Sequence, residues 1–266
     1  MEINLLGPVS ARMHGQSVLP RAAKPRQVFA LLALNVGRIV RVSTLVDELW
    51  GGHQPRGYMT TLQTYVYQLR QCLASALGGD SGRSAKDVLA TRYDGYLLDV
   101  PSGETDVAEF RRLTRSGCAA FDAGDDHEAS LLLDRALALW RGRALADLPV
   151  GCVLEPEVVS LEDTRLGALE RRVETYLRLG RHTELLGELG KLVAQNPTHE
   201  GLRAHFMTAL YRAGHTARAL SEFQRLRNVL VAESGIEPSP RLQRLQGAIL
   251  MGDPALELID GRSAAV

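Results

Sequence analysis

The sequence predicts a mainly α-helical protein in two parts, a mixed part of about a hundred residues and an all-helical part built from repeats. Three observations support this. Two short segments with strand and turn signals flank three helical segments in residues 1–100. Beyond Pro101 the apolar residues recur only at the helical period. Gly180 and Gly214 lie 34 residues apart, which is the period of tetratricopeptide repeats.

The composition is that of a globular protein long enough for two domains, with 266 residues, 45% hydrophobic and 23% charged. No run of about 18 apolar residues predicts a membrane span. The amino terminus lacks the basic and apolar regions of a signal peptide, so we expect a cytoplasmic protein. Cys72, Cys118 and Cys152 form no CxxC motif, and we interpret them as buried or idle thiols.

The charge is unevenly distributed although the net charge is zero. Residues 1–100 contain 11 Lys and Arg against 7 Asp and Glu, whereas residues 101–266 contain 20 against 24. This asymmetry is typical of a basic module that meets an anion, joined to a module that does not.

The first elements are a small sheet and a helix. In "EINLLG", Ile3 and Leu5 alternate on one side of a strand, and "VSARMHGQSVLP" predicts a hairpin around His14-Gly15. A helix follows in "KPRQVFALLALNVGR", with a proline in its first turn and a glycine, Gly37, just past its end. Its predicted buried stripe is Val28, Leu31, Leu32 and Val36.

The second helix lies in "VSTLVDELWGG". Ser43 or Thr44 is its predicted N-cap, Asp47 follows Thr44 by three residues, and Gly51 ends it.

The third helix spans residues 60–78 and carries the most informative surface. Leu62, Val66, Leu69 and Leu73 make one apolar stripe. The opposite face has neither Glu nor Lys, and its side chains are Thr60, Thr64, Tyr67, Gln68 and Gln71. Gln bonds adenine in a bidentate way, Thr bonds a base edge or contacts the thymine methyl group, and Tyr reaches a phosphate. The face either reads DNA or packs against another protein.

A wing completes this part. "GGDSGRSAKD" reads as a polar loop, and "VLATRYDGYLLDV" as two strands around Asp94-Gly95. Small sheet, three helices and hairpin make a winged helix-turn-helix, in which the third helix enters the major groove and the helix before it braces the backbone.

The stretches "INLLGPVSA", "VDELWGG", "TLQTYVYQLR" and "DGYLLDV" resemble the OmpR-type winged helix of the SARP family, the Streptomyces antibiotic regulatory proteins. The resemblance implies base contacts by Gln63, Thr64 and Gln68. The candidate phosphate contacts are Lys24, Arg26, Thr44, Trp50, Tyr67, Arg70, Gln71, Arg92 and Asp94. Arg70 lies about 80° around the helix from Leu62, so a surface role beside the core is its alternative.

The helical part is predicted from 104 to 252, after the winged helix of 1–103 and before a tail of 253–266. Its predicted helices are 106–123, 127–141, 156–179, 182–195, 199–213, 215–233 and 239–250. The repeat-like positions are Tyr176, Leu185, Leu189, Pro197, Ala219 and Phe223. Such an array buries a continuous core and offers a concave surface to a partner.

The stretch "ALALWRGRALADLP" resembles the bacterial transcriptional activation domain of the same family. We interpret Trp140 as a core residue that closes the first helical pair. Arg141 and Arg143 are either surface charges or contacts between the two parts.

Catalytic and metal motifs are not apparent. There is no P-loop, no GxGxxG after a strand and no GxSxG. In "HEGLRAH" the histidines are six residues apart, whereas a zinc helix needs four. We therefore expect no enzyme, no metal and no cofactor.

The resemblance implies an activator of antibiotic or other secondary-metabolite genes. It would bind direct repeats in double-stranded promoter DNA near the −35 element, beside a second protomer, and recruit RNA polymerase holoenzyme including its sigma factor. We expect a fragment of residues 1–105 to bind DNA more weakly and to fail in activation. The alternative is a helical-repeat adaptor whose winged helix does not bind DNA.

Overall fold

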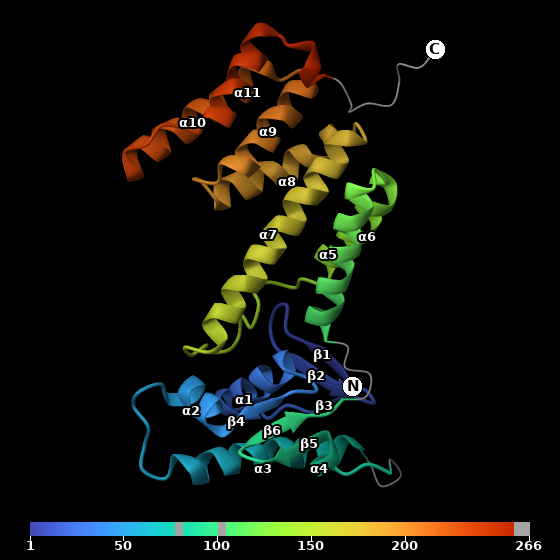
Figure 1. Cartoon of the computed structure of the whole chain (residues 1–266), viewed down its shortest axis with the longest axis vertical. Helices are drawn as coiled ribbons and strands as arrows, with labels where there is room; N and C mark the ends of the chain where they lie inside the picture. The colour runs from blue at the N-terminus through green and yellow to red at the C-terminus, as the bar shows by residue number, and fades with distance from the viewer. Residues whose placement is uncertain (78–81, 101–104, 258–266) are drawn as a thin grey trace. The chain divides into compact units, whose positions relative to one another are not determined.

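The computed structural model describes residues 1–77, 82–100 and 105–257 (Figure 1). It divides into two compact units, the first made of residues 1–115 and 135–166 and the second of residues 116–134 and 167–266. The predicted boundary between residues 103 and 104, and residues 258–266 of the predicted tail, lie outside the described residues.

The amino-terminal sheet is antiparallel, with the strand order β1 (Glu2–Asn4), β2 (Ser10–Met13) and β3 (Gln16–Ser17). The predicted hairpin is confirmed, because His14 (φ 50°) and Gly15 (φ 80°) form its two-residue turn with both φ angles positive. The predicted inward-facing side chains at residues 3 and 5 are buried.

Helices α1 (Ala23–Leu34), α2 (Val42–Trp50) and α3 (Tyr58–Leu77) form the core of the winged helix, with α1 packed against both others. The predicted stripe of α1 was too narrow. Buried residues surround the helix, including Gln27 and Phe29, because the sheet and both other helices enclose it. Val36 lies beyond the end of α1 and is only half-buried.

A strand that the sequence did not predict, β4 (Ile39–Arg41), runs directly into α2. The predicted cap of α2 is therefore wrong, since the helix already begins at Val42, has Arg41 as its N-cap and has no side-chain cap. The first N–H of α2, on Val42, donates instead to the carbonyl oxygen of Asp94 at 2.8 Å. The predicted end at Gly51 is confirmed.

The wing is formed by β5 (Leu89–Arg92) and β6 (Gly95–Leu98), and the second sheet has the order β4-β6-β5. Its turn is Tyr93-Asp94, one residue earlier than predicted, and Tyr93 has a φ of 48°. The glycine that follows is needed for close packing, because a Cβ there would lie 2.3 Å from the carbonyl oxygen of Val40.

The segment predicted as a polar loop before the wing contains a short helix, α4 (Ala85–Val88). The Ser84 N–H donates to the Asp87 carboxylate at 2.7 Å, an N-terminal cap that the loop prediction overlooked. Residues 78–81 of that segment lie outside the described residues.

The helical part is confirmed almost element by element, each predicted end lying within three residues of the observed one. The observed helices are α5 (Asp106–Asp122), α6 (Asp126–Ala138), α7 (Leu154–Arg178), α8 (His182–Gln195), α9 (Glu200–Arg212), α10 (Thr216–Ser234) and α11 (Pro240–Met251), followed by the short 3₁₀ helix η1 (Pro254–Leu256).

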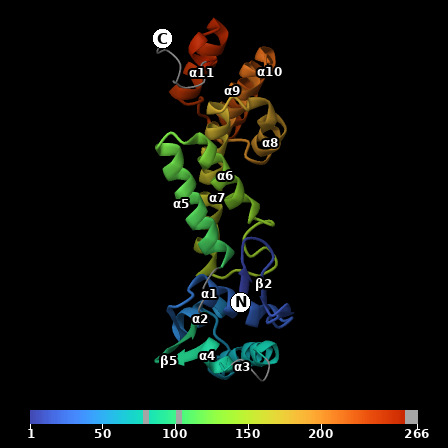
Figure 2. The same ribbon diagram turned by 90° about the vertical axis from the view of Figure 1, so that its right-hand side faces the viewer.

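In the second unit α9 packs against α8 and α10, and α11 packs against α9 and α10 (Figures 1 and 2). The two repeat glycines, Gly180 and Gly214, have φ angles of 73° and 79° just past helix ends. Of the repeat-like positions, Tyr176, Leu185, Leu189, Ala219 and Phe223 are buried, whereas Pro197 is exposed. This confirms the repeat-like packing of the buried positions.

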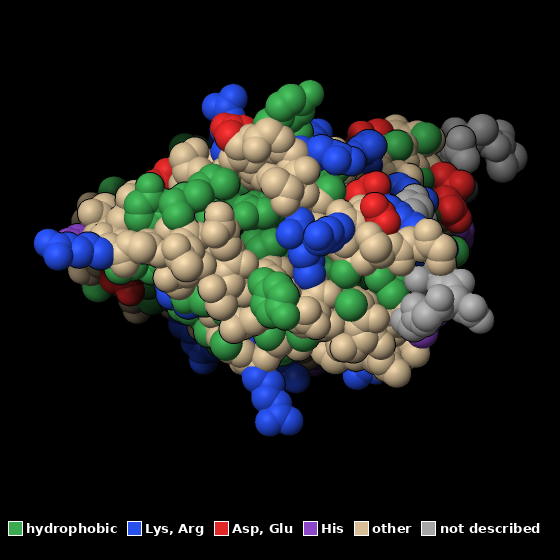
Figure 3. Space-filling model, turned by 90° about the horizontal axis from the view of Figure 1, so that it is seen from below, with side chains coloured by type: hydrophobic (Ala, Val, Ile, Leu, Met, Phe, Trp, Pro, Cys, Tyr) green, Lys and Arg blue, Asp and Glu red, His purple; other side chains and the backbone are tan. Residues whose placement is uncertain are grey.

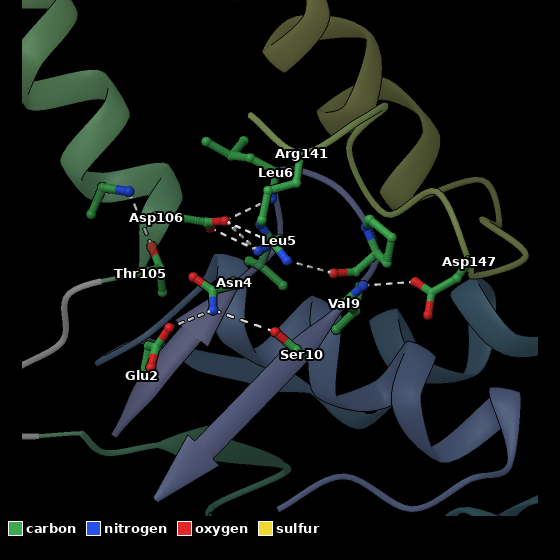
Figure 4. A network of polar contacts seen from close by, with 12 residues as sticks. Glu2, Asn4, Leu5, Leu6, Val9, Ser10, Thr105, Asp106, Arg141 and Asp147 are labelled. Atoms are coloured by element: carbon green, nitrogen blue, oxygen red, sulfur yellow. Dashed lines mark hydrogen bonds and ion pairs between the residues drawn. The ribbon is translucent and has the colours of Figure 1, made fainter. Parts of the chain in front are cut away.

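Inside the first unit, carboxylates hold the amino-terminal sheet to the start of the helical part (Figure 4). Asp106, the first residue of α5, accepts the Leu5 N–H at 2.7 and 2.8 Å and the Leu6 N–H at 2.9 Å, and it pairs with Arg141 at 3.2 Å. Burial raises the pKa of Asp106, while the two N–H groups and the guanidinium act in the opposite direction. Asp147 likewise accepts the Val9 N–H at 2.7 Å.

Trp140 is a core residue, as predicted, with its ring centroid 5.3 Å from that of Phe110 and the Arg165 guanidinium 4.6 Å above it. The structure also resolves the alternatives for the two arginines that follow. Arg141 contacts the amino-terminal sheet through Asp106 and the Pro8 carbonyl oxygen, whereas Arg143 is exposed.

The histidines and cysteines discussed in the sequence analysis show no metal-binding arrangement among the described residues. His199 Nδ1 accepts the Leu202 N–H at 3.2 Å, and burial lowers the pKa of His205. Among the described residues, no cluster of three or more His, Cys, Asp or Glu is arranged to hold a metal ion. Cys152 is exposed rather than buried. Within the described ranges, no helix has the length and hydropathy needed to cross a bilayer.

Candidate nucleic-acid interface

The exposed face of α3 combines three of the predicted base-reading side chains with a complete lack of carboxylates. Gln63, Thr64 and Gln68 are exposed, and no Asp or Glu occurs from Tyr58 to Leu77. The predicted apolar stripe of α3 is buried on the opposite side, against α1. In Figure 3, which views the molecule from below, uncharged side chains cover much of the surface, Lys and Arg side chains project from it at several places, and Asp and Glu gather toward the right.

Two further predicted residues extend this face. Tyr67 is 61% exposed and Gln71 is exposed one turn further along α3. The Thr64 hydroxyl donates to the Thr60 carbonyl oxygen at 2.9 Å. Its lone pairs and its methyl group therefore remain for a base edge.

Trp50 connects α2 to α3 instead of standing free. Its ring stacks on Tyr65 at an interplanar angle of 20° and meets the edge of Tyr58, each with centroids 6.4 Å apart. Thr44 lies half-buried in the first turn of α2, whose N-terminus has no side-chain cap. The Val42 N–H is already bonded to the Asp94 carbonyl oxygen, so a phosphate oxygen would have to use the later N–H groups of this first turn.

Two of the residues predicted to contact phosphate, Lys24 and Arg26, donate hydrogen bonds to acceptors within the protein. The Lys24 Nζ donates to the Leu49 carbonyl oxygen near the end of α2. The Arg26 guanidinium donates to the Val9 carbonyl oxygen at 2.8 Å and pairs with Asp147. Both residues therefore make bonds inside the first unit, and their contact with phosphate stays a prediction.

Arg70 also differs from its predicted role. Its Nε and Nη2 donate to the Leu89 carbonyl oxygen at 3.0 and 2.8 Å, and Nη2 donates to the Thr91 Oγ1 at 2.9 Å. The guanidinium therefore braces β5 of the wing against α3, which agrees with the alternative that the sequence left open.

The wing tip presents one predicted phosphate contact in an open position. Arg92 is exposed at the end of β5. Asp94 is also exposed and lies 3.8 Å from Arg41. A carboxylate repels phosphate, so we leave Asp94 out of the interface and assign it the backbone contact that begins α2.

Sequence reasoning missed several exposed residues around α3. Lys86 of α4 lines a groove of about 350 Å³ together with Gln63, Tyr67, Arg70 and Gln71. Arg56 precedes α3 and is exposed, and Tyr93 at the wing tip is 95% exposed. The sequence does show basic residues next to predicted helix starts and turns. It does not show which of these residues lie on the same side as the exposed face of α3, because that depends on the fold.

We expect Arg92→Ala to change mainly DNA affinity and Arg70→Ala to change mainly protein stability. Loss of Arg92 should weaken binding to every duplex and make the slope of log affinity against log salt shallower by about one unit, with stability changed by less than about 0.5 kcal/mol. Loss of Arg70 should lower the free energy of unfolding by about 1.5–3 kcal/mol, because charged hydrogen bonds to the wing disappear.

Salt titrations by fluorescence anisotropy and urea denaturation measure both quantities. An Arg70→Ala protein of unchanged stability with a shallower slope would restore Arg70 as a phosphate contact. An unchanged slope in Arg92→Ala would remove Arg92 from the interface.

Comparison with known proteins matches both parts of the chain. The family "Transcriptional regulatory protein, C terminal" matches residues 16–98, and the family "Bacterial transcriptional activator domain" matches residues 105–250. The regulatory protein DnrI of Streptomyces peucetius is 52% identical over 97% of this chain and 94% of its own length. The transcriptional regulator RedD of Streptomyces coelicolor is 34% identical, over 97% and 73%.

A longer relative and a solved structure also match nearly the whole of this chain. The regulatory protein AfsR of Streptomyces coelicolor is 36% identical over 99% of this chain, which spans only 26% of AfsR. The structure of Mycobacterium tuberculosis EmbR in complex with a low affinity phosphopeptide superimposes with a TM-score of 0.87 and 30% identity, over 96% of this chain and 68% of that chain.

A winged helix of the OmpR type joined to this helical domain defines a DNA-binding transcription regulator, a class without enzymatic activity. Within that class, the chain belongs to the SARP family. The expectations of family, fold class and non-enzymatic function from the sequence are thereby confirmed.

Proposed function

We propose that this protein activates secondary-metabolite genes by binding direct repeats near the −35 element of their promoters and by recruiting RNA polymerase. The observation that carries the proposal is the exposed, carboxylate-free face of α3, since a helix in this position of a winged helix enters the major groove. Base edges are read by Gln63, Thr64 and Gln68. Phosphates are held by Tyr67, Gln71, Arg92, the start of α2 at Thr44, and Lys86.

The two parts of the chain divide the work. The winged helix selects the site, and the helical domain provides the surface for RNA polymerase holoenzyme, including its sigma factor. Direct repeats place two protomers side by side in the same orientation, without a two-fold axis. Each protomer then adds to the affinity of the other on DNA. The protein acts in the cytoplasm, where promoter DNA lies.

The change Gln68→Ala tests base reading. We expect a loss of about 1–3 kcal/mol on the cognate duplex and relaxed preference at one base pair, because the bidentate amide contact is removed. Genome-wide mapping of bound DNA followed by footprinting defines that duplex. Anisotropy titrations then compare it with a scrambled duplex of the same length and salt concentration.

The matched control is Gln224→Ala, which removes an exposed glutamine from α10, outside the winged helix. It should leave both affinities unchanged. If Gln68→Ala weakens cognate and scrambled duplexes equally, Gln68 does not read a base. If the unaltered protein shows no salt-dependent affinity for any mapped site, the adaptor function replaces DNA binding.

A further inference from the structure

A buried carboxylate on α2 accepts hydrogen bonds from the backbone at the start of α7 and from the residues just before it. Glu48 is 3% exposed. Its Oε1 accepts the Gly151 N–H at 2.6 Å, and its Oε2 accepts the Val153 N–H at 3.0 Å and the Leu154 N–H at 2.8 Å. Oε1 also accepts a hydrogen bond from Nε2 of Gln27, on α1, at 2.6 Å.

These contacts make Glu48 the cap of α7, supplied from another element. The N–H groups at the start of a helix have no partner within it, and the helix dipole favours negative charge there. In most helices a nearby Ser, Thr, Asp or Asn in the same chain segment fills this role. Here α7 begins at Leu154 and the carboxylate comes from α2, about a hundred residues earlier.

The fit at this contact leaves no room for a side chain on the α7 side. A Cβ on Gly151 would lie 2.1 Å from the backbone carbonyl oxygen of Glu48 and 2.9 Å from its Oε2. The approach of the two segments therefore depends on glycine at position 151 as much as on the carboxylate at position 48.

On its other side α2 is bound to the DNA-reading helix. Trp50, two residues after Glu48, packs against Tyr58 and Tyr65 of α3. The position of α2 is thus fixed by α3 at one point and by the α7 cap at the other.

We propose that Glu48 is a positioning residue for activation. By capping α7 it anchors the start of this helix to α2 and α3 inside the first unit, so that the helical segment which leads into the activation domain stays coupled to the winged helix on the promoter. This inference rests on the proposed function, because it assumes DNA binding by α3 and polymerase contact by the helical domain.

The test compares Glu48→Gln and Gly151→Ala in the full-length protein. The Glu48→Gln change is isosteric, but the amide keeps only one acceptor oxygen and opposes two N–H donors with its own NH₂ group. The Gly151→Ala change opens the same contact from the other side and keeps the carboxylate. We expect each variant to retain the affinity for a single half-site within about threefold. Transcript from a saturated promoter should fall at least about threefold.

Hydrogen exchange supplies a second readout. The Val153 and Leu154 amides should exchange at least about tenfold faster in both variants, while the Val66 and Leu69 amides in the buried stripe of α3 stay protected. The matched control is Asp47→Asn, which removes the same charge from the neighbouring exposed position and should change neither measurement.

Three outcomes overturn the inference. Equal transcript from wild-type and both variants at equal promoter occupancy would show that the α7 cap is dispensable. A loss of transcript fully accounted for by lost DNA affinity, or faster exchange throughout α3, would reduce Glu48 to a stabilising residue. By contrast, a wild-type protein that neither binds nor activates a mapped promoter would refute the proposed function itself.

Discussion

A fragment that ends at residue 105 is expected to be unfolded or only partly folded, although the sequence led us to expect that it still binds DNA, but more weakly. It lacks Asp106, the acceptor for the Leu5 and Leu6 N–H groups, and Asp147, the acceptor for the Val9 N–H. It also lacks the donors around the buried carboxylate of Glu48. The compact unit itself extends to residue 115 and includes residues 135–166.

The expected cost is large on the scale of domain stability. Each buried N–H left without a partner costs about 1–3 kcal/mol. Several such groups together approach the total stability of a typical domain, about 5–15 kcal/mol. A fragment of residues 1–166 keeps all these partners and is the matched comparison.

Thermal melting by circular dichroism and dispersion of amide resonances measure the difference. The longer fragment should melt cooperatively, and the shorter one should not. Cooperative melting of residues 1–105 within a few degrees of the full chain would show that the carboxylate ties contribute little to folding, and the original expectation would then stand.

Replacing Asp106 by Ala should have the largest effect of any single change at the first turn of α5. Two buried N–H groups, on Leu5 and Leu6, lose their acceptor, and Arg141 loses its partner. At about 1–3 kcal/mol for each orphaned N–H, we expect the free energy of unfolding to fall by about 2–6 kcal/mol.

Glu109→Ala is the control, because it removes a carboxylate from the same turn of the same helix. Glu109 pairs with Arg112, an exposed residue three positions away, through two bonds of 2.7 Å. Exposed pairs of this kind are worth about 0.2–1 kcal/mol. Urea denaturation separates the two variants, and comparable losses from both would contradict the role assigned to Asp106.

The sequence predicted well wherever one local pattern decides the structure. The 3.6-residue period located seven helices of the helical part, and the buried stripe of α3 was predicted residue by residue. It failed for β4, because three residues pairing with β6 have no periodicity of their own. It failed for the cap of α2, because the acceptor there is the carbonyl oxygen of Asp94, which lies far from Val42 in the chain.

The candidate site shows the same limit. Thr64 and Gln68 were predicted from a helix face and Gln63 from the family resemblance, and all three side chains are exposed. Lys24, Arg26 and Arg70 were selected because basic side chains suit phosphates, yet each bonds to a protein acceptor. A positive charge in a sequence does not reveal its partner, because each of these acceptors lies at least 17 residues away along the chain.

The junction inside the first unit depends on backbone donors rather than on matching side chains. Glu48, Asp106 and Asp147 each accept from main-chain N–H groups of the opposite segment. Main-chain donors are present whatever the residue, proline excepted. Donor positions other than Gly151 can therefore change their side chains without compensating changes on the acceptor side. Chimeras that exchange helical domains should keep a functional junction if these three acidic residues and Gly151 are retained, which makes the junction a natural point for recombination between family members.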